Sequence, residues 1–396
     1  MILAAGTLAQ ASFTTVSVGL PALAPALRTH YGLTLGETGV VLGAVGIGML
    51  LTLLPWGLLS DRLGERTIIA VGLVVAAGAL AAAGLTQTYA SLVVWLAVAG
   101  AFGASVNAAS GRAVMAWFEV EERGLALGIR QTAIPIGGAA AAATLPWLAS
   151  TGGTRRAFFT LAAACLAGAA VAVTLMRDAP ARPVATAVGG RGPLRDAGMW
   201  LLAGGSSLYL LSQMAIASFV VLFLHDYRGL SAHRSAAVLA GINVIGIGTR
   251  IAAGRWSDRI GSRLRPLRLI GVLLAVAMAL ATALLDAPLG VLIPALVVAG
   301  VLGISWNGLS FTAAAESAGL ARSGAALGFQ QTLLGVVGAG FPPAFAAVVT
   351  ASSWRTAFAL CVLGPVLGLA ALWRVPEPPT GTARRRGTSA MPPAVR

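Results

Sequence analysis

The chain has 396 residues, of which 57% are hydrophobic and only 10% are charged. Soluble domains carry about 25% charged residues, so this composition excludes a water-soluble globular protein. The formal net charge of +14 would suit a nucleic-acid-binding protein if the chain were soluble. The arginines, however, lie between apolar stretches rather than on one tail, which argues against nucleic acid as a partner.

Twelve apolar stretches follow one another, each long enough to cross a hydrocarbon core of ~30 Å as a helix. The first has neither a basic segment before it nor a small-residue cleavage site, so we expect a membrane helix rather than a signal peptide. The predicted fold is an all-α polytopic membrane protein. The stretches cover residues 2–27, 36–59, 67–86, 91–117, 124–149, 156–176, 199–224, 233–256, 267–286, 289–314, 324–350 and 355–374.

Loop arginines predict the orientation. With a cytoplasmic N-terminus, 18 arginines fall in inside loops and tails and 6 in outside loops, so both termini are predicted to be cytoplasmic, in the plasma (inner) membrane. Residues 1–177 and 199–374 are each expected to form a six-helix bundle. Residues 178–198 are predicted to form a cytoplasmic linker and residues 375–396 a disordered cytoplasmic tail, because both segments are rich in Pro, Gly and Arg.

The two halves repeat one another. The string GLLSDRLGER over 57–66 recurs as GRWSDRIGSR over 254–263, which is 197 positions later. Ser105, Asn107 and Ser110 recur 200 positions later, as do the ALG and QT segments over 126–128 and 131–132. This pattern indicates two parallel, pseudo-symmetric six-helix repeats.

The repeated loop string resembles the signature between helices 2 and 3 of the major facilitator superfamily, and the resemblance covers residues 1–376. It implies a secondary carrier that works by alternating access, with the signature loops as a cytoplasmic latch between the bundles. Arg112 is expected to join this gate through a pair with a nearby carboxylate. The predicted gating residues are Gly57, Asp61, Arg62, Gly64, Arg66, Arg112, Gly254, Asp258, Arg259, Gly261 and Arg263.

Two local patterns predict structure rather than chemistry. Thr34 and Glu37 have the spacing of a capping box at the start of the second helix. Pro135, Gly137 and Gly138 resemble the tail of the antiporter motif of the same superfamily, and predict a bend with close helix packing.

Arg130 and Arg250 are the most informative residues, because charge inside a membrane is costly and normally faces a partner or an aqueous cavity. Both lie about 10 Å inside the cytoplasmic edge by helix rise. By the repeat, Arg130 corresponds to Gln330 and Arg250 to Leu53, so each breaks the internal symmetry. Features present in only one half can serve a substrate rather than the scaffold.

The surroundings of both arginines resemble small-anion carriers. The segment after Arg250 resembles helix 8 of the oxalate/formate and monocarboxylate branches, where an arginine at this place binds the substrate carboxylate. The segment around Arg130 resembles the cyanate-permease branch. A guanidinium suits a carboxylate because it donates two parallel hydrogen bonds. The alternatives are a structural ion pair or snorkelling for Arg250, and a structural role for Arg130.

Other polar residues on cavity helices are candidates to complete the substrate site, or are hydrogen-bond partners between helices. They are Gln10, Asn107, Tyr209, Gln213, Asn243, Asn307 and Gln330. The acidic and histidine residues lie near helix ends or in loops, and the sequence has no metal-binding, phosphate-binding or nucleophile motif. We therefore expect neither an enzyme nor a bound metal or cofactor.

The predicted function is the transport of a small anionic solute such as a carboxylate, by a carrier that contacts lipid and is expected to be monomeric. Two alternatives stay open at this point. One is efflux of hydrophobic drugs, and the other is a membrane receptor or scaffold that transports nothing.

Overall fold

The computed structural model describes residues 2–118, 126, 129–177, 195–318 and 323–376. Within these residues the chain is almost entirely helical. The helices are α1 (Ile2–Ser17), α2 (Leu20–Tyr31), α3 (Leu35–Leu63), α4 (Glu65–Leu85), α5 (Tyr89–Trp117), α7 (Ala133–Leu175), α8 (Ala197–Leu222), η2 (Phe223–Tyr227), α9 (Ala232–Ile260), α10 (Leu264–Ala283), α11 (Leu289–Ser305), α12 (Asn307–Ala318), α13 (Ser323–Ala351) and α14 (Trp354–Trp373).

Eleven described segments are long and apolar enough to cross a membrane, and one of them, Ile129–Leu175, has 47 residues. Its helix α7 is broken at Gly152 and Gly153, and Gly153 has φ 69°, which favours glycine. The break divides α7 into the fifth and sixth predicted crossings, so twelve crossings result. The first crossing likewise consists of α1 and α2, and the tenth of α11 and α12.

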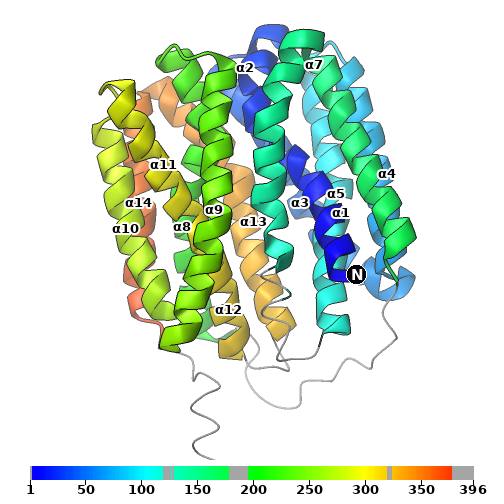
Figure 1. The fold of residues 1–396 in the computed structure, drawn as a ribbon, viewed down its shortest axis with the longest axis vertical. Helices are drawn as coiled ribbons and strands as arrows, with labels where there is room; N and C mark the ends of the chain where they lie inside the picture. Colours follow the sequence, from blue (N-terminus) through cyan, green and yellow to red (C-terminus); the bar gives the residue numbers. More distant parts are fainter. Residues whose placement is uncertain (1, 119–125, 127–128, 178–194, 319–322, 377–396) are drawn as a thin grey trace, which may run out of the picture.

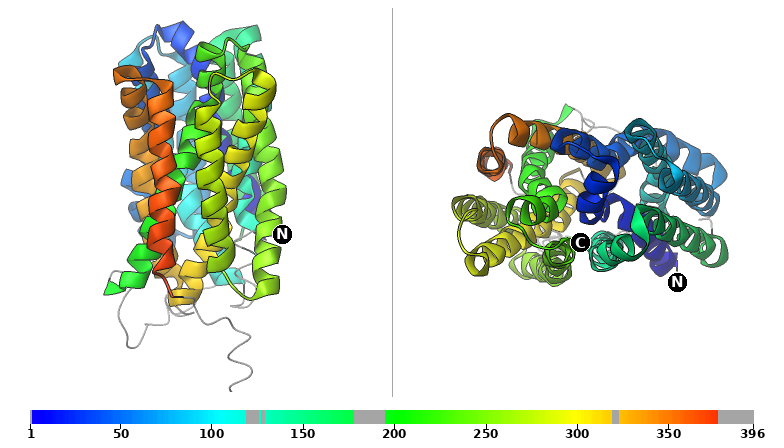
Figure 2. Two further views of the ribbon diagram at one scale, coloured as in Figure 1. Left: turned by 90° about the vertical axis from the view of Figure 1, so that its left-hand side faces the viewer. Right: turned by 90° about the horizontal axis from the view of Figure 1, so that it is seen from above.

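The helices form two bundles. α1–α7 lie on one side of the molecule and α8–α14 on the other, as Figure 1 and the view from above in Figure 2 show. The seam between the bundles is built mainly by α3 against α13 and by α7 against α9. The fold class predicted from the internal repeat is therefore confirmed. The linker 178–198 and the tail 375–396 lie largely outside the described residues.

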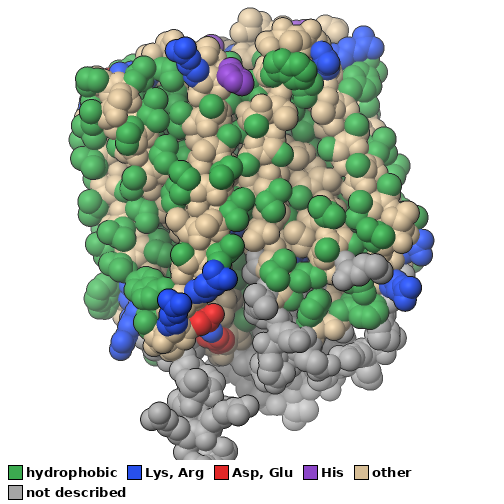
Figure 3. All heavy atoms as spheres, in the orientation of Figure 1, with side chains coloured by type: hydrophobic (Ala, Val, Ile, Leu, Met, Phe, Trp, Pro, Cys, Tyr) green, Lys and Arg blue, Asp and Glu red, His purple; other side chains and the backbone are tan. Residues whose placement is uncertain are grey.

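The two ends of the molecule differ from the band between them. We call the end that carries the turns at Gly64 and Gly261 the signature end, and the other the opposite end. Figure 3 shows hydrophobic side chains over the middle of the visible face and basic side chains towards both ends. This distribution fits a protein whose middle lies in lipid.

The predicted capping box and the predicted close packing at Gly137 are confirmed, whereas the bend at Pro135 stays a prediction. Thr34 caps α3 through a hydrogen bond from the Glu37 amide, and the Glu37 carboxylate accepts one from the Thr34 amide, which completes the capping box. In α7, a Cβ added at Gly137 would lie 2.8 Å from the carbonyl oxygen of Ala11 on α1. The glycine therefore allows the close helix packing that the sequence predicts.

Candidate substrate site and gates

Arg250 lies on α9 at the seam, and its guanidinium binds neutral acceptors. Nε donates to the carbonyl oxygen of Ile304 at 2.6 Å, and one Nη donates to Oδ1 of Asn307 at 2.9 Å. The other Nη donates to the carbonyl oxygen of Gln131 at 3.2 Å, across the seam in the first bundle. Among the described residues no carboxylate pairs with Arg250. Described residues accept from three of its five N–H donors, and two N–H groups have no described partner.

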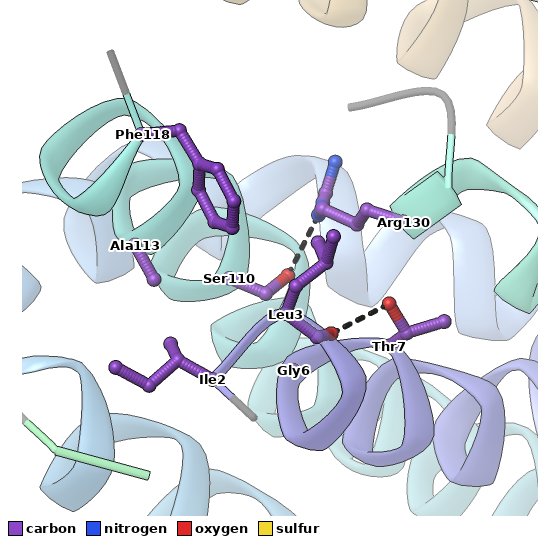
Figure 4. Close-up of a pocket in the computed structure, with 8 residues that line it drawn as sticks. All are labelled: Ile2, Leu3, Gly6, Thr7, Ser110, Ala113, Phe118 and Arg130. Atoms are coloured by element: carbon purple, nitrogen blue, oxygen red, sulfur yellow. Dashed lines mark hydrogen bonds between the residues drawn. The ribbon is translucent and has the colours of Figure 1, made fainter. Parts of the chain in front are cut away.

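Arg130 has different surroundings. It is buried against α5, where Nε donates to Oγ of Ser110 and one Nη donates to the carbonyl oxygen of Asn107, both at 2.9 Å. Figure 4 shows its guanidinium beside Ser110 in a pocket that is otherwise lined largely by α1. The volume of this pocket is about 10 Å³, which is room for about one water molecule. Arg130 thus lies inside its own bundle, whereas Arg250 lies between the two.

The internal repeat explains the position of Arg130. Its counterpart Gln330 donates through Nε2 to Ser310, the counterpart of Ser110, and is fully buried in the second bundle. Ser310 in turn contacts Ser206 on α8. The two side chains therefore hold equivalent places, each tying the fifth helix of a bundle to its fourth. Arg130 differs from Gln330 by adding a positive charge to this contact.

The four amide residues form two symmetric pairs. Nε2 of Gln10 donates to Oδ1 of Asn107 at 3.1 Å in the first bundle. Nδ2 of Asn307 donates to Oε1 of Gln213 at 3.4 Å in the second. In both pairs the glutamine is buried and the asparagine is partly exposed. The glutamines therefore orient the asparagines, and only Asn307 also contacts Arg250.

Asn243 and Tyr209 lie apart from this group. Nδ2 of Asn243 donates to the carbonyl oxygen of Leu239, and the side chain packs beside Gly138 of the first bundle. Tyr209 is fully buried, its ring packs edge-on against Trp306, and its hydroxyl lies against Gly271 of α10. The structure therefore places Asn243 in the seam and Tyr209 in the core of the second bundle.

The second copy of the signature forms a compact ionic cluster. Arg263 pairs with Asp258 and with Glu316 of α12, and it also donates to Oγ of Ser257 at 3.0 Å. Gly261 ends α9 with φ 61°, a left-handed conformation that brings the chain back into the cluster. Nearby, Gly254 has open space around it, and Arg259 is exposed. The partners of Arg263 among the described residues belong to the second bundle.

The first copy is described less fully. Gly64 separates α3 from α4 with φ 81°, and Gly57 has open space around it. Arg66 lies in the first turn of α4. The side chains of Asp61, Arg62 and Arg112 lie outside the described ones, so the pair predicted for Arg112 stays a prediction.

The opposite end is closed by contacts between the bundles that sequence reasoning missed. Arg28 of α2 pairs with Asp226 of η2, and Asp226 also contacts His225.

At the same end, α3 lies backbone to backbone against α13. A Cβ added at Gly39 would lie 2.6 Å from Cβ of Ala346, and one at Gly43 would lie 3.1 Å from the carbonyl oxygen of Ala339. We call Gly39, Gly43 and Gly46 the glycine ridge; spacing of three and four residues was its signal in the sequence.

The family model for the Major Facilitator Superfamily matches residues 4–342. The chain belongs to the Major Facilitator Superfamily. It is 33% identical over 351 residues to an uncharacterized MFS-type transporter of Mycobacterium tuberculosis, which covers 88% of this chain and 79% of the relative. It is 26% identical over 282 residues to a probable sulfoacetate transporter of Cupriavidus necator, which covers 66% of each chain.

Solved structures support the same fold for this major facilitator protein. A bacterial homolog of the human lysosomal transporter Spinster superposes with a TM-score of 0.78 and 16% identity, over 99% of this chain and 98% of that one. A D-xylose-proton symporter superposes with a TM-score of 0.76 and 18% identity, over 94% and 97%. By its family, the chain is a multi-pass membrane transporter and not an enzyme.

Proposed function

We propose that this secondary transporter carries a small anionic solute, and that Arg250 binds the anionic group. The observation that carries the proposal is the guanidinium of Arg250, partly exposed at the seam and surrounded by neutral acceptors. A charge inside a membrane protein is costly without a counter-charge. A carboxylate or sulfonate from the solute would supply that charge and use the two free N–H groups.

Asn307 and Asn107 are the residues we propose to contact the rest of the solute. Each is partly exposed, and each is held by a buried glutamine on the neighbouring helix of its own bundle. The two asparagines are related by the internal repeat, 200 positions apart, so one asparagine would face the solute from each side of the seam. The relative named as a probable sulfoacetate transporter is consistent with an anionic cargo.

The proposed setting is the plasma membrane, with the signature end and both termini in the cytoplasm, as the loop arginines indicate. In that orientation the closed opposite end faces outward, so the solute would reach Arg250 from the cytoplasmic side in this conformation. We propose that one chain forms one carrier, because each bundle supplies half of the candidate site.

Transport in proteoliposomes tests the proposal. Uptake of radiolabelled formate, oxalate, pyruvate and sulfoacetate would be measured for the wild type, Arg250→Gln and Arg250→Lys. We expect Arg250→Gln to abolish uptake and Arg250→Lys to lose most of it, because an ammonium group lacks the planar fork. Arg255→Gln is the matched control, since Arg255 is exposed on the same helix. Wild-type uptake in Arg250→Gln would contradict the proposal and favour drug efflux, which export of a hydrophobic dye would then test.

A further inference from the structure

Pro135 leaves a carbonyl group free at the start of α7. In an α-helix the carbonyl of residue i accepts from the amide of residue i+4. For Gln131 that residue is Pro135, which has no N–H to donate. The next carbonyl in the chain, that of Thr132, is satisfied normally by the amide of Ile136 at 3.1 Å. The Gln131 carbonyl therefore needs a partner from elsewhere.

Arg250 is that partner, and it comes from the other bundle. Its Nη lies 3.2 Å from the Gln131 carbonyl oxygen. Between described residues, only two side-chain hydrogen bonds cross the seam, this one and the Arg28 contact with Asp226 at the opposite end. The Arg250 contact thus ties α9 to the residue that lies two positions before α7, near the proposed substrate site.

Both halves of this tie break the internal symmetry. At the position equivalent to Pro135, the second half has Gly335, whose amide is available to its own helix. At the position equivalent to Arg250, the first half has Leu53. The free carbonyl therefore occurs only in the first repeat and its arginine donor only in the second. The two groups form a hydrogen bond across the seam. A scaffold contact needed by both repeats would be expected twice.

We propose that Pro135 is a positioning residue. Because it leaves the Gln131 carbonyl without a helical partner, it provides Arg250 with an acceptor in the empty carrier, where the substrate anion binds in the loaded one. This inference rests on the proposed role of Arg250. In the empty carrier the Gln131 carbonyl holds the guanidinium and ties the bundles. A bound anion is a stronger, charged acceptor. When it binds the two free N–H groups, it draws the guanidinium towards itself, and the hydrogen bond to the Gln131 carbonyl is lost. The loaded carrier is then free to change conformation, whereas the empty one is held. Such a carrier exchanges anions more readily than it moves them one way.

Pulsed EPR on the empty protein tests the tie without a substrate. Spin labels would be attached after Ile129→Cys and Ile251→Cys, at two exposed positions that flank the tie, with Cys165 and Cys361 replaced by Ala. We expect a narrow distance distribution in the wild type. Pro135→Ala restores an amide that captures the Gln131 carbonyl, so the distribution should broaden towards longer distances.

Two further variants make this measurement decisive. Arg250→Gln removes the donor of the same hydrogen bond, so it should broaden the distance distribution similarly. The double variant Pro135→Ala with Arg250→Gln should give a distribution no broader than that of either single variant. Pro146→Ala, which restores an amide elsewhere in α7, is the matched control and should leave the distribution narrow. The proposal is wrong if Pro135→Ala and Pro146→Ala give the same distribution, or if Arg250→Gln leaves it narrow.

Flux measurements separate this inference from the proposed function. Net uptake of sulfoacetate or oxalate into empty vesicles would be compared with exchange into preloaded ones. We expect Pro135→Ala to raise the ratio of net uptake to exchange roughly tenfold, the scale of one hydrogen bond to a charged group. If Arg250→Gln keeps full uptake, the proposed function fails. If it abolishes uptake but Pro135→Ala leaves the ratio unchanged, only the role of Pro135 fails.

Discussion

At the scale of single residues, the environments of the two membrane arginines assign them different tasks. Arg250 lies between the bundles and binds neutral acceptors from both. Arg130 lies within one bundle and makes the contact that Gln330 makes in the other. In the sequence the two residues look alike, because each is a charge inside a membrane helix and each breaks the internal symmetry. The structure distinguishes them, because Arg250 lies at the seam and Arg130 lies inside the first bundle.

The equivalence of Arg130 and Gln330 leads to a prediction for Arg130→Gln. The protein already places a glutamine at this position in its second half, bonded to the equivalent serine. We therefore expect Arg130→Gln to fold, with a melting temperature within a few degrees of the wild type. Anion uptake should fall less than in Arg250→Gln. A larger loss of uptake from Arg130→Gln than from Arg250→Gln, in equally folded preparations, would reverse the two roles.

The sequence singles out candidate site residues, which stay predictions, but it gives little indication of their contacts. The internal sequence repeat alone shows that Arg130 and Arg250 have no charged counterpart in the other half. The acceptors of Arg250 at Ile304 and Gln131 are backbone carbonyls, which every residue has, so residue identity gives little sign of them. Tyr209 shows the converse, because a polar hydroxyl in an apolar helix suggested a site although its ring fills the bundle core.

At the scale of helices, hydropathy predicted the elements closely and their breaks less well. The crossings begin and end within a few residues of the predicted stretches because charged and turn residues mark the membrane boundary. The break in the first crossing between α1 and α2 and that between α11 and α12 were not predicted. Hydropathy averages over a window of residues and so does not detect them.

The glycine ridge on α3 gives an element-scale prediction. In Gly39→Ala the new Cβ would lie 2.6 Å from Cβ of Ala346 and 2.7 Å from the carbonyl oxygen of Pro342, so α3 and α13 must separate. We expect a membrane-impermeant thiol reagent, added outside, to label Ala346→Cys several-fold faster in this background. Gly36→Ala is the control, because its Cβ would meet no atom within 4 Å. Equal labelling in both would show that the ridge does not hold this end closed.

At the scale of the whole molecule, the two ends are stabilised differently. At the opposite end, ionic contacts include one across the seam, Arg28 with Asp226. Asp286 there accepts hydrogen bonds from Arg355 and Tyr227, which hold the pKa of its carboxyl below the usual range. At the signature end, the described ion pairs of Arg263 stay within the second bundle. Between described residues, the ion pair that crosses the seam therefore lies at the opposite end.

The orientation of the whole chain is also a prediction, and it rests on the 18 inside and 6 outside arginines of the predicted loops. Reporter fusions after residue 190 and at the C-terminus should both report a cytoplasmic location. An external signal from either fusion would contradict the orientation and the assignment of the closed end to the outside. A fusion after residue 230, in the turn between η2 and α9, should report the outside and serves as the control.

The glycine ridge also bears on the energy supply of the cell. Membranes store work as proton and sodium gradients, and a carrier that opens to one side must not let these ions cross. Where Gly39 meets α13, an added Cβ would lie 2.6 Å from Cβ of Ala346, which leaves no room for a methyl group, and at Gly43 it would lie 3.1 Å from a carbonyl oxygen. A file of water molecules, along which protons would hop, has no path through such a contact. We therefore expect the ridge to limit the leak of protons and ions, so that solute can be released on one side while the membrane voltage is kept.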